Sequence, residues 1–173
     1  LVNNDVNGIL EDRDGRIWFA TNNGICIWDP VHDQWNTLYN NNLKQAQVFL
    51  ALCEDHQGRI WAGSYSSGVY VLDRKSGKEL AHYAKGISGS PAVSNFIFDI
   101  FEDSDHDLWI GGVNGEYVCY NIKENSFKTF SEEPVSSFAQ FSPTQILVGH
   151  SYGLSLLNKQ DGKRTGNVYI IDD

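Results

Sequence analysis

Short apolar runs recur along the whole chain, and turn-forming residues separate them. Three of these runs are "IWFA" from Ile17, "IWAG" from Ile60 and "LWIG" from Leu108, and none alternates cleanly between apolar and polar residues. Each run has the length of a β-strand, and no stretch of useful length shows the period of a helix. The pattern therefore predicts an all-β chain whose inner strands are covered on both faces.

One phrase is written three times: "EDRDGRIWFAT" from Glu11, "EDHQGRIWAGS" from Glu54 and "EDSDHDLWIGG" from Glu102. Around each copy, the chain has an apolar residue before the phrase, a Trp within it and a Gly after it. These positions are Val6, Trp18 and Gly24, then Phe49, Trp61 and Gly68, then Ile97, Trp109 and Gly115. A fourth, eroded copy keeps the same frame at Val135, Phe138, Gln140, Leu147 and Gly153.

The repeat predicts a β-propeller. Each copy holds four apolar pieces of strand length, and a four-stranded unit with a period of about 40–50 residues is typical of a propeller blade. We expect about four four-stranded antiparallel blades, which form a segment of a larger propeller. The blades cover residues 1–42, 43–90, 91–131 and 132–173, and their inner strands contain Val6–Asp12, Phe49–Asp55, Ile97–Asp103 and Val135–Phe141.

The repeated phrase is interpreted as the hairpin between the first two strands of a blade. Asp12 opens the turn by accepting bonds from nearby backbone N–H groups, and Trp18 covers the next blade. Gly15 and Gly58 take a positive φ, and His106 takes the same conformation at some cost. Neighbouring residues of a strand point to opposite faces, so the Glu–Asp pair is not expected to be catalytic.

Composition excludes several partners and gives no sign of a cofactor. The net charge of −9 and the lack of a basic stripe argue against nucleic acid as a partner. No apolar run of 18 residues exists, so we expect no membrane contact by this segment. Cys26, Cys53 and Cys119 lie in apolar strand patterns without a CxxC pair, and we interpret them as small buried hydrophobes.

The phrases "GRIWFATNNGI" and "GRIWAGSYSSGV" closely resemble the two-component regulator propeller repeat. The third copy departs from it at His106 and Gly112, and the fourth keeps only the apolar frame and Gly153. The resemblance implies an extracytoplasmic sensor of a bacterial two-component system, on the periplasmic or extracellular side, whose relatives often detect glycans. It also implies propellers of about seven blades, so we expect the remaining blades of a parent protein, or a homo-oligomer, as partners.

Two other functions stay open. The phrase is also similar to lyase and lactonase propellers, which need converging His, carboxylate and metal ligands. The five His residues are His32, His56, His82, His106 and His150, and His150 alone is placed to face a site. We therefore expect no catalytic residues, no metal site and no cofactor. The second alternative is a propeller that serves purely as a protein-binding scaffold.

The loops between second and third strands are expected to lie on one rim together with the connections between blades. Their side chains are amides, hydroxyls and aromatic rings, which suit a saccharide ligand. The predicted ligand-binding residues are Asn22, Asn23, Tyr65, Ser66, Asn114, His150 and Tyr152. The opposite rim carries Arg13, Asp14, His56, Gln57 and Asp105, which we interpret as solvated turns.

Overall fold

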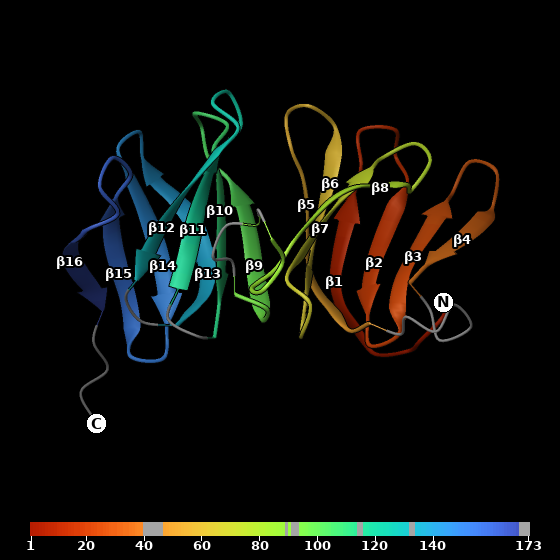
Figure 1. Cartoon of the computed structure of the whole chain (residues 1–173). Helices are drawn as coiled ribbons and strands as arrows, with labels where there is room; N and C mark the ends of the chain where they lie inside the picture. The colour runs from red at the N-terminus through yellow and green to blue at the C-terminus, as the bar shows by residue number, and fades with distance from the viewer. Residues whose placement is uncertain (40–46, 89, 91–93, 114–115, 132–133, 170–173) are drawn as a thin grey trace.

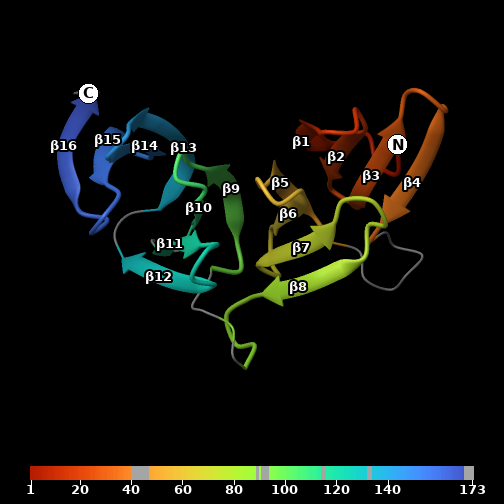
Figure 2. The same ribbon diagram turned by 90° about the horizontal axis from the view of Figure 1, so that it is seen from above.

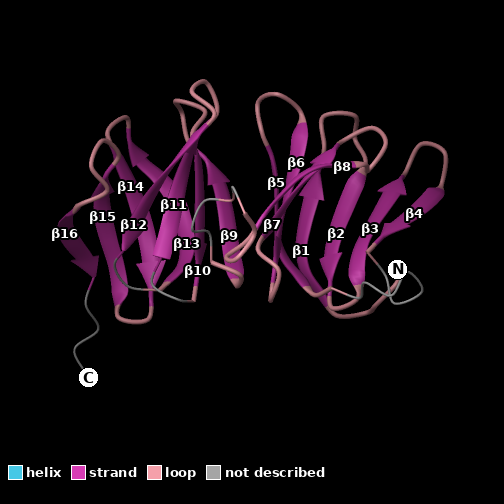
Figure 3. Cartoon of the chain, viewed as in Figure 1, coloured by secondary structure: helices cyan, strands magenta, loops and turns pink. Residues whose placement is uncertain are grey.

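The computed structural model describes residues 1–39, 47–88, 90, 94–113, 116–131 and 134–169. These residues form four four-stranded antiparallel sheets and contain no helix (Figure 3). The described part of the chain therefore has no helix that could cross a membrane. Within each sheet, neighbouring strands follow one another in the sequence. The strands are β1 (Val6–Glu11), β2 (Ile17–Thr21), β3 (Gly24–Asp29), β4 (Gln34–Leu38), β5 (Phe49–Glu54), β6 (Arg59–Ser64), β7 (Val69–Asp73), β8 (Glu79–Tyr83), β9 (Ile97–Glu102), β10 (Leu108–Gly112), β11 (Glu116–Asn121), β12 (Ser126–Ser131), β13 (Val135–Ser142), β14 (Gln145–His150), β15 (Gly153–Asn158) and β16 (Arg164–Tyr169).

The four sheets stand side by side in an arc, as blades do in a propeller (Figure 2). Inner strands β1, β5, β9 and β13 gather on one side of the arc, and outer strands β4, β8, β12 and β16 lie on the other. The arc has two rims (Figure 1). The hairpin rim carries the turns between first and second strands and between third and fourth strands. The connection rim carries the loops between second and third strands and the connections between blades.

Three apolar clusters fill the spaces between neighbouring blades. Trp18 packs with Phe49 and Ile60 between the first and second blades, and Trp61 packs with Ile97 between the second and third. Trp109 lies with Phe138 between the third and fourth blades. All three Trp side chains are fully buried, which confirms that each covers the next blade.

The hairpin turns have the backbone expected from the repeat. Gly15 has a φ of 79° and Gly58 a φ of 78°. His106 has a φ of 68°, although it is not a glycine. The first three inner strands end one residue earlier than expected. Asp12, Asp55 and Asp103 lie just after the strands because their backbone N–H groups close the turns, by donating to the carbonyls of Arg16, Arg59 and Asp107.

The first blade has one face that no other blade covers. On the covered face, Trp18 and Ile25 are fully buried against the second blade. On the uncovered face, the Trp35 ring stacks at 5.7 Å from Trp28 and at 5.9 Å from Phe19. Trp35 is 50% exposed, so apolar surface remains open at this end of the arc.

Candidate functional site

A buried carboxylate holds each Trp of the repeat on the hairpin rim. The indole Nε1 of Trp18 donates to Asp12 Oδ2 at 2.8 Å, and Trp61 and Trp109 make the same bond to Asp55 and Asp103 at 2.7 and 2.8 Å. In the first blade, the other carboxylate oxygen accepts from the backbone N–H groups of Asp14 and Arg16. The Asp therefore opens the turn, as expected, and also orients the Trp, a role that the sequence analysis did not assign.

The positive charge that balances this buried carboxylate comes from two sources. In the first blade, the guanidinium of Arg16 lies 2.8 Å from Asp12. Burial favours a raised pKa for Asp12, but the bonds from Trp18 and Arg16 outweigh it and lower the pKa. In the third blade, Asp107 replaces the Arg, and Lys159 of the fourth blade lies 2.9 Å from Asp103.

The turns of the hairpin rim are mostly exposed, as expected, but they are also joined across blades. The backbone N–H of Arg13 donates to Glu54 at 2.9 Å, and that of His56 donates to Glu102 at 3.0 Å. Asp14 pairs with Arg74, and Asp105 pairs with Lys159. The last residues of β5 and β9, Glu54 and Glu102, therefore bond to the turn of the preceding blade, so these exposed turns also contribute to the contact between blades. Of the five residues, Arg13, Asp14, Gln57 and Asp105 are exposed, and His56 is half-buried.

The predicted ligand-binding residues lie on the connection rim. Asn22 and Asn23 lie between β2 and β3, Tyr65 and Ser66 between β6 and β7, and His150 and Tyr152 at the junction of β14 and β15. Asn114 lies outside the described residues. These loops belong to the first, second and fourth blades, so the residues form several positions along one rim.

Some of these polar side chains are already bonded within the protein. Asn22 accepts from the Asn7 amide at 2.9 Å and donates to Asp5 at 3.2 Å. His150 Nε2 lies 2.7 Å from the Ser155 hydroxyl, and its Nδ1 accepts from the backbone N–H of Tyr152. These bonds fix the loops, whereas the aromatic rings of Tyr65 and Tyr152 are exposed.

Two tyrosine rings stand out from the connection rim. Tyr65 is 50% exposed, and its ring meets Phe96 edge-on at 5.1 Å. Tyr152 is 72% exposed, with its ring centroid 6.4 Å from that of His150. An exposed ring that rests against a fixed neighbour offers a flat apolar face and a hydroxyl at low entropic cost.

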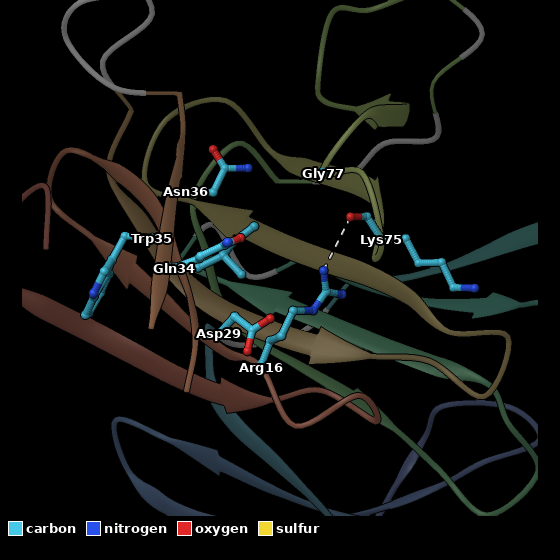
Figure 4. A pocket seen from close by; sticks show the side chains of 8 residues that line it. Arg16, Asp29, Gln34, Trp35, Asn36, Lys75 and Gly77 are labelled. Carbon is cyan, nitrogen blue, oxygen red and sulfur yellow. Dashed lines mark hydrogen bonds between the residues drawn. The ribbon is translucent and has the colours of Figure 1, made fainter. Parts of the chain in front are cut away.

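A polar groove lies elsewhere, at the outer edge between the first blade and the β7–β8 turn. Its volume is about 370 Å³, and Arg16 crosses it to donate to the Lys75 carbonyl at 3.3 Å (Figure 4). Trp35 points away from Arg16 and Lys75. The lining residues are Arg16, Ile27, Asp29, Gln34, Trp35, Asn36, Lys75 and Gly77. The sequence analysis missed this groove because its two walls come from different blades.

The architecture defines a segment of a β-propeller. Residues 1–23, 42–66 and 92–114 match the sequence profile described as "Two component regulator propeller". These three segments therefore match the repeat of the two-component regulator propeller family, as the repeated phrase indicated. No curated protein matches the chain.

Solved structures share this fold. The chain is similar to the extracellular domain of the hybrid two component system BT3049 from B. thetaiotaomicron, with a TM-score of 0.80, 18% identity and 96% of this chain covered. It is also similar to the extracellular domain of the hybrid two component system BT4673 from the same organism, with a TM-score of 0.73, 20% identity and 97% covered. The chain spans about a quarter of these structures, at 25% and 24% of their length.

Proposed function

We propose that the chain is a segment of an extracytoplasmic, ligand-sensing propeller of a two-component signalling protein, and that its ligand is an oligosaccharide. Two findings support the sensing role. Three segments match the repeat of the two-component regulator propeller family, and the fold resembles the extracellular domains of hybrid two component systems. The segment then works on the periplasmic or extracellular side, with a histidine kinase elsewhere in the parent protein.

The exposed tyrosines of the connection rim carry the proposal for a saccharide. The C–H faces of a sugar ring pack on aromatic rings, and sugar hydroxyls bond to amides and hydroxyls. Tyr65 and Tyr152 offer such rings on loops that a rigid sheet supports. Because they lie on the second and fourth blades, we expect a ligand of several sugar units rather than a monosaccharide.

The enzyme alternative has less support on this rim. A lyase-like propeller needs His and carboxylate groups that are available to a metal and a substrate. His150, the residue placed by sequence on this rim, is engaged by Ser155 and by the backbone of Tyr152. A protein-binding role is favoured by a different observation, the uncovered aromatic face of the first blade around Trp35.

A glycan array followed by calorimetry with the best-bound oligosaccharide tests the proposal. Tyr65→Ala and Tyr152→Ala should each weaken binding about tenfold or more, since one lost stacking contact of about 1.5 kcal/mol corresponds to that factor. Asp14→Ala on the hairpin rim and Trp35→Ala beside the polar groove are the matched controls, and both should bind normally. Loss of binding in Trp35→Ala with retention in Tyr152→Ala would move the ligand to the groove or the uncovered face.

A further inference from the structure

Two histidines from neighbouring blades meet at one carboxylate on the hairpin rim. His56 lies in the β5–β6 turn and His106 in the β9–β10 turn, whereas Glu102 is the last residue of β9. Glu102 Oε1 lies 2.8 Å from His56 Nδ1 and 3.2 Å from His106 Nδ1. The two imidazole rings are stacked, with centroids 4.3 Å apart. Both Nδ1 atoms thus lie next to the same carboxylate oxygen.

The backbone fixes this convergence. The His56 N–H also donates to Glu102 Oε1 at 3.0 Å, so the carboxylate is tied to the turn of the preceding blade. His106 stands where the first two turns have Gly15 and Gly58, and its φ of 68° directs a side chain that those turns lack. The Glu102 side chain is 16% exposed and His56 is 29% exposed, so both are partly sheltered from water.

We propose that His56, Glu102 and His106 form a binding site for a divalent transition-metal ion of the Zn²⁺ type, which links the second and third blades. Two imidazole nitrogens and one carboxylate oxygen are a ligand set that Zn²⁺ prefers and that Mg²⁺ and Ca²⁺ do not. In a tetrahedral site with bonds of about 2.0 Å, ligand atoms lie about 3.3 Å apart. The separations from Glu102 Oε1 are 3.2 Å for His106, which matches this spacing, and 2.8 Å for His56, which is shorter, and all three ligand atoms lie within 4.8 Å of one another.

The coordination would remain open on one side. The His106 side chain is 52% exposed, so water or a group from a binding partner can take the fourth position. The metal would replace the hydrogen bonds that now run from the imidazoles to Glu102, and it would require neutral Nδ1 atoms. The alternative is a hydrogen-bonded cluster that binds no metal, and the experiment separates the two.

The decisive experiment is a Zn²⁺ titration of the purified protein against a chromophoric chelator. Wild type should bind one Zn²⁺ per chain, and His106→Gly should bind it at least tenfold more weakly. His106→Gly is expected to fold, because Gly occupies the same turn position at Gly15 and Gly58. The matched control is His32→Gln, which removes a histidine that pairs with Asp29 at 2.7 Å but has no second imidazole beside it, and it should bind Zn²⁺ like wild type.

A second readout reports on the ligand atoms directly. In long-range ¹H–¹⁵N spectra, Zn²⁺ should shift the Nδ1 resonances of His56 and His106 and leave those of His82 unchanged, since His82 lies against the Ser67 carbonyl. Zn²⁺ should also raise the Tm of wild type and not that of His106→Gly. Equal affinity in wild type and His106→Gly, or no shift at either Nδ1, would overturn the proposal and leave a hydrogen-bonded cluster only.

Discussion

The two rims of the arc come from the same repeat but are used differently. On the hairpin rim, a backbone N–H in the turn between first and second strands donates to the next blade in the first three blades, as Arg13 does to Glu54 and Ser104 to Gln140. On the connection rim, exposed rings such as Tyr65 and Tyr152 stand on loops that internal bonds hold in place, and the backbone N–H of Gly68 also donates to the Asn95 carbonyl in the connection to the next blade. Both rims thus contribute to the contact between blades, but the exposed aromatic rings of the proposed recognition site lie on the connection rim alone.

The largest expected effect concerns the buried carboxylate of the hairpin rim. Asp55 is fully buried and accepts from Trp61 Nε1, the Arg59 backbone and Arg59 Nε. Asp55→Ala leaves these donors unpaired and should lower the free energy of unfolding by about 3–5 kcal/mol. Urea unfolding followed by Trp fluorescence measures the loss. A loss below about 1 kcal/mol would mean that the carboxylate is dispensable and that apolar packing alone places the Trp.

The next largest effect is expected at Lys159 of the fourth blade, which supplies the positive charge beside the buried Asp103 of the third blade. Lys159 lies 2.9 Å from Asp103 and 2.6 Å from Asp105, and it is largely buried. Lys159→Met should cost about 1.5–3 kcal/mol, because it removes charge-assisted bonds to a buried carboxylate. The matched control is Lys163→Met, whose cation is 81% exposed and lies 4.0 Å from Asp161, and it should change stability little.

The same pair predicts a pH dependence. The hydrogen bond and charge of Lys159 lower the pKa of Asp105 from 3.8. A carboxyl with a lowered pKa in the folded state stabilises the protein above its unfolded pKa, and this contribution is lost as the pH falls through the folded value. As the pH falls from about 5 to below 3.8, the free energy of unfolding of wild type should therefore decrease more than that of Lys159→Met. Parallel pH profiles for the two proteins would contradict this pairing.

A smaller effect of opposite sign is expected at Asp107, which stands where the first two blades have Arg16 and Arg59. Burial, together with the charge of Asp103, raises the pKa of Asp107. A raised pKa means that the charged form is disfavoured in the folded state. Asp107→Asn should therefore stabilise the protein at pH 7 by at most about 1 kcal/mol. The gain should shrink as the pH falls through the folded pKa and should be lost below 3.8, where the Asp107 carboxyl is neutral in both states.

The smallest effect on stability is expected on the connection rim. Tyr152 is 72% exposed, so Tyr152→Ala should change the free energy of unfolding by no more than about 0.5 kcal/mol. The same holds for Tyr65→Phe, which keeps the edge contact with Phe96. A loss of more than about 2 kcal/mol in Tyr152→Ala would give this rim a structural role and weaken the contrast between the rims.

Much of the fold could be predicted because the residues that specify each strand and turn lie close together in every copy of the repeat. Short apolar runs, the Asp–Gly turn and the recurring Trp predicted the four sheets and the positive φ values of Gly15 and His106. Contacts between blades could not be predicted in the same way, since Arg13 and Glu54 meet only when two sheets pack. The recurring Glu before each Asp was the available signal, because Glu54 and Glu102 each accept a backbone N–H from the turn of the preceding blade.

Hydrogen exchange with and without the oligosaccharide selected on the array tests the division between the rims most directly. The account predicts slower exchange at the amides of the connection-rim loops, around Asn23, Tyr65 and Tyr152, and unchanged exchange at the hairpin turns around Asp14 and Gln57. Protection confined to the hairpin turns, with no change at the three loops, would contradict it and place recognition on the hairpin rim.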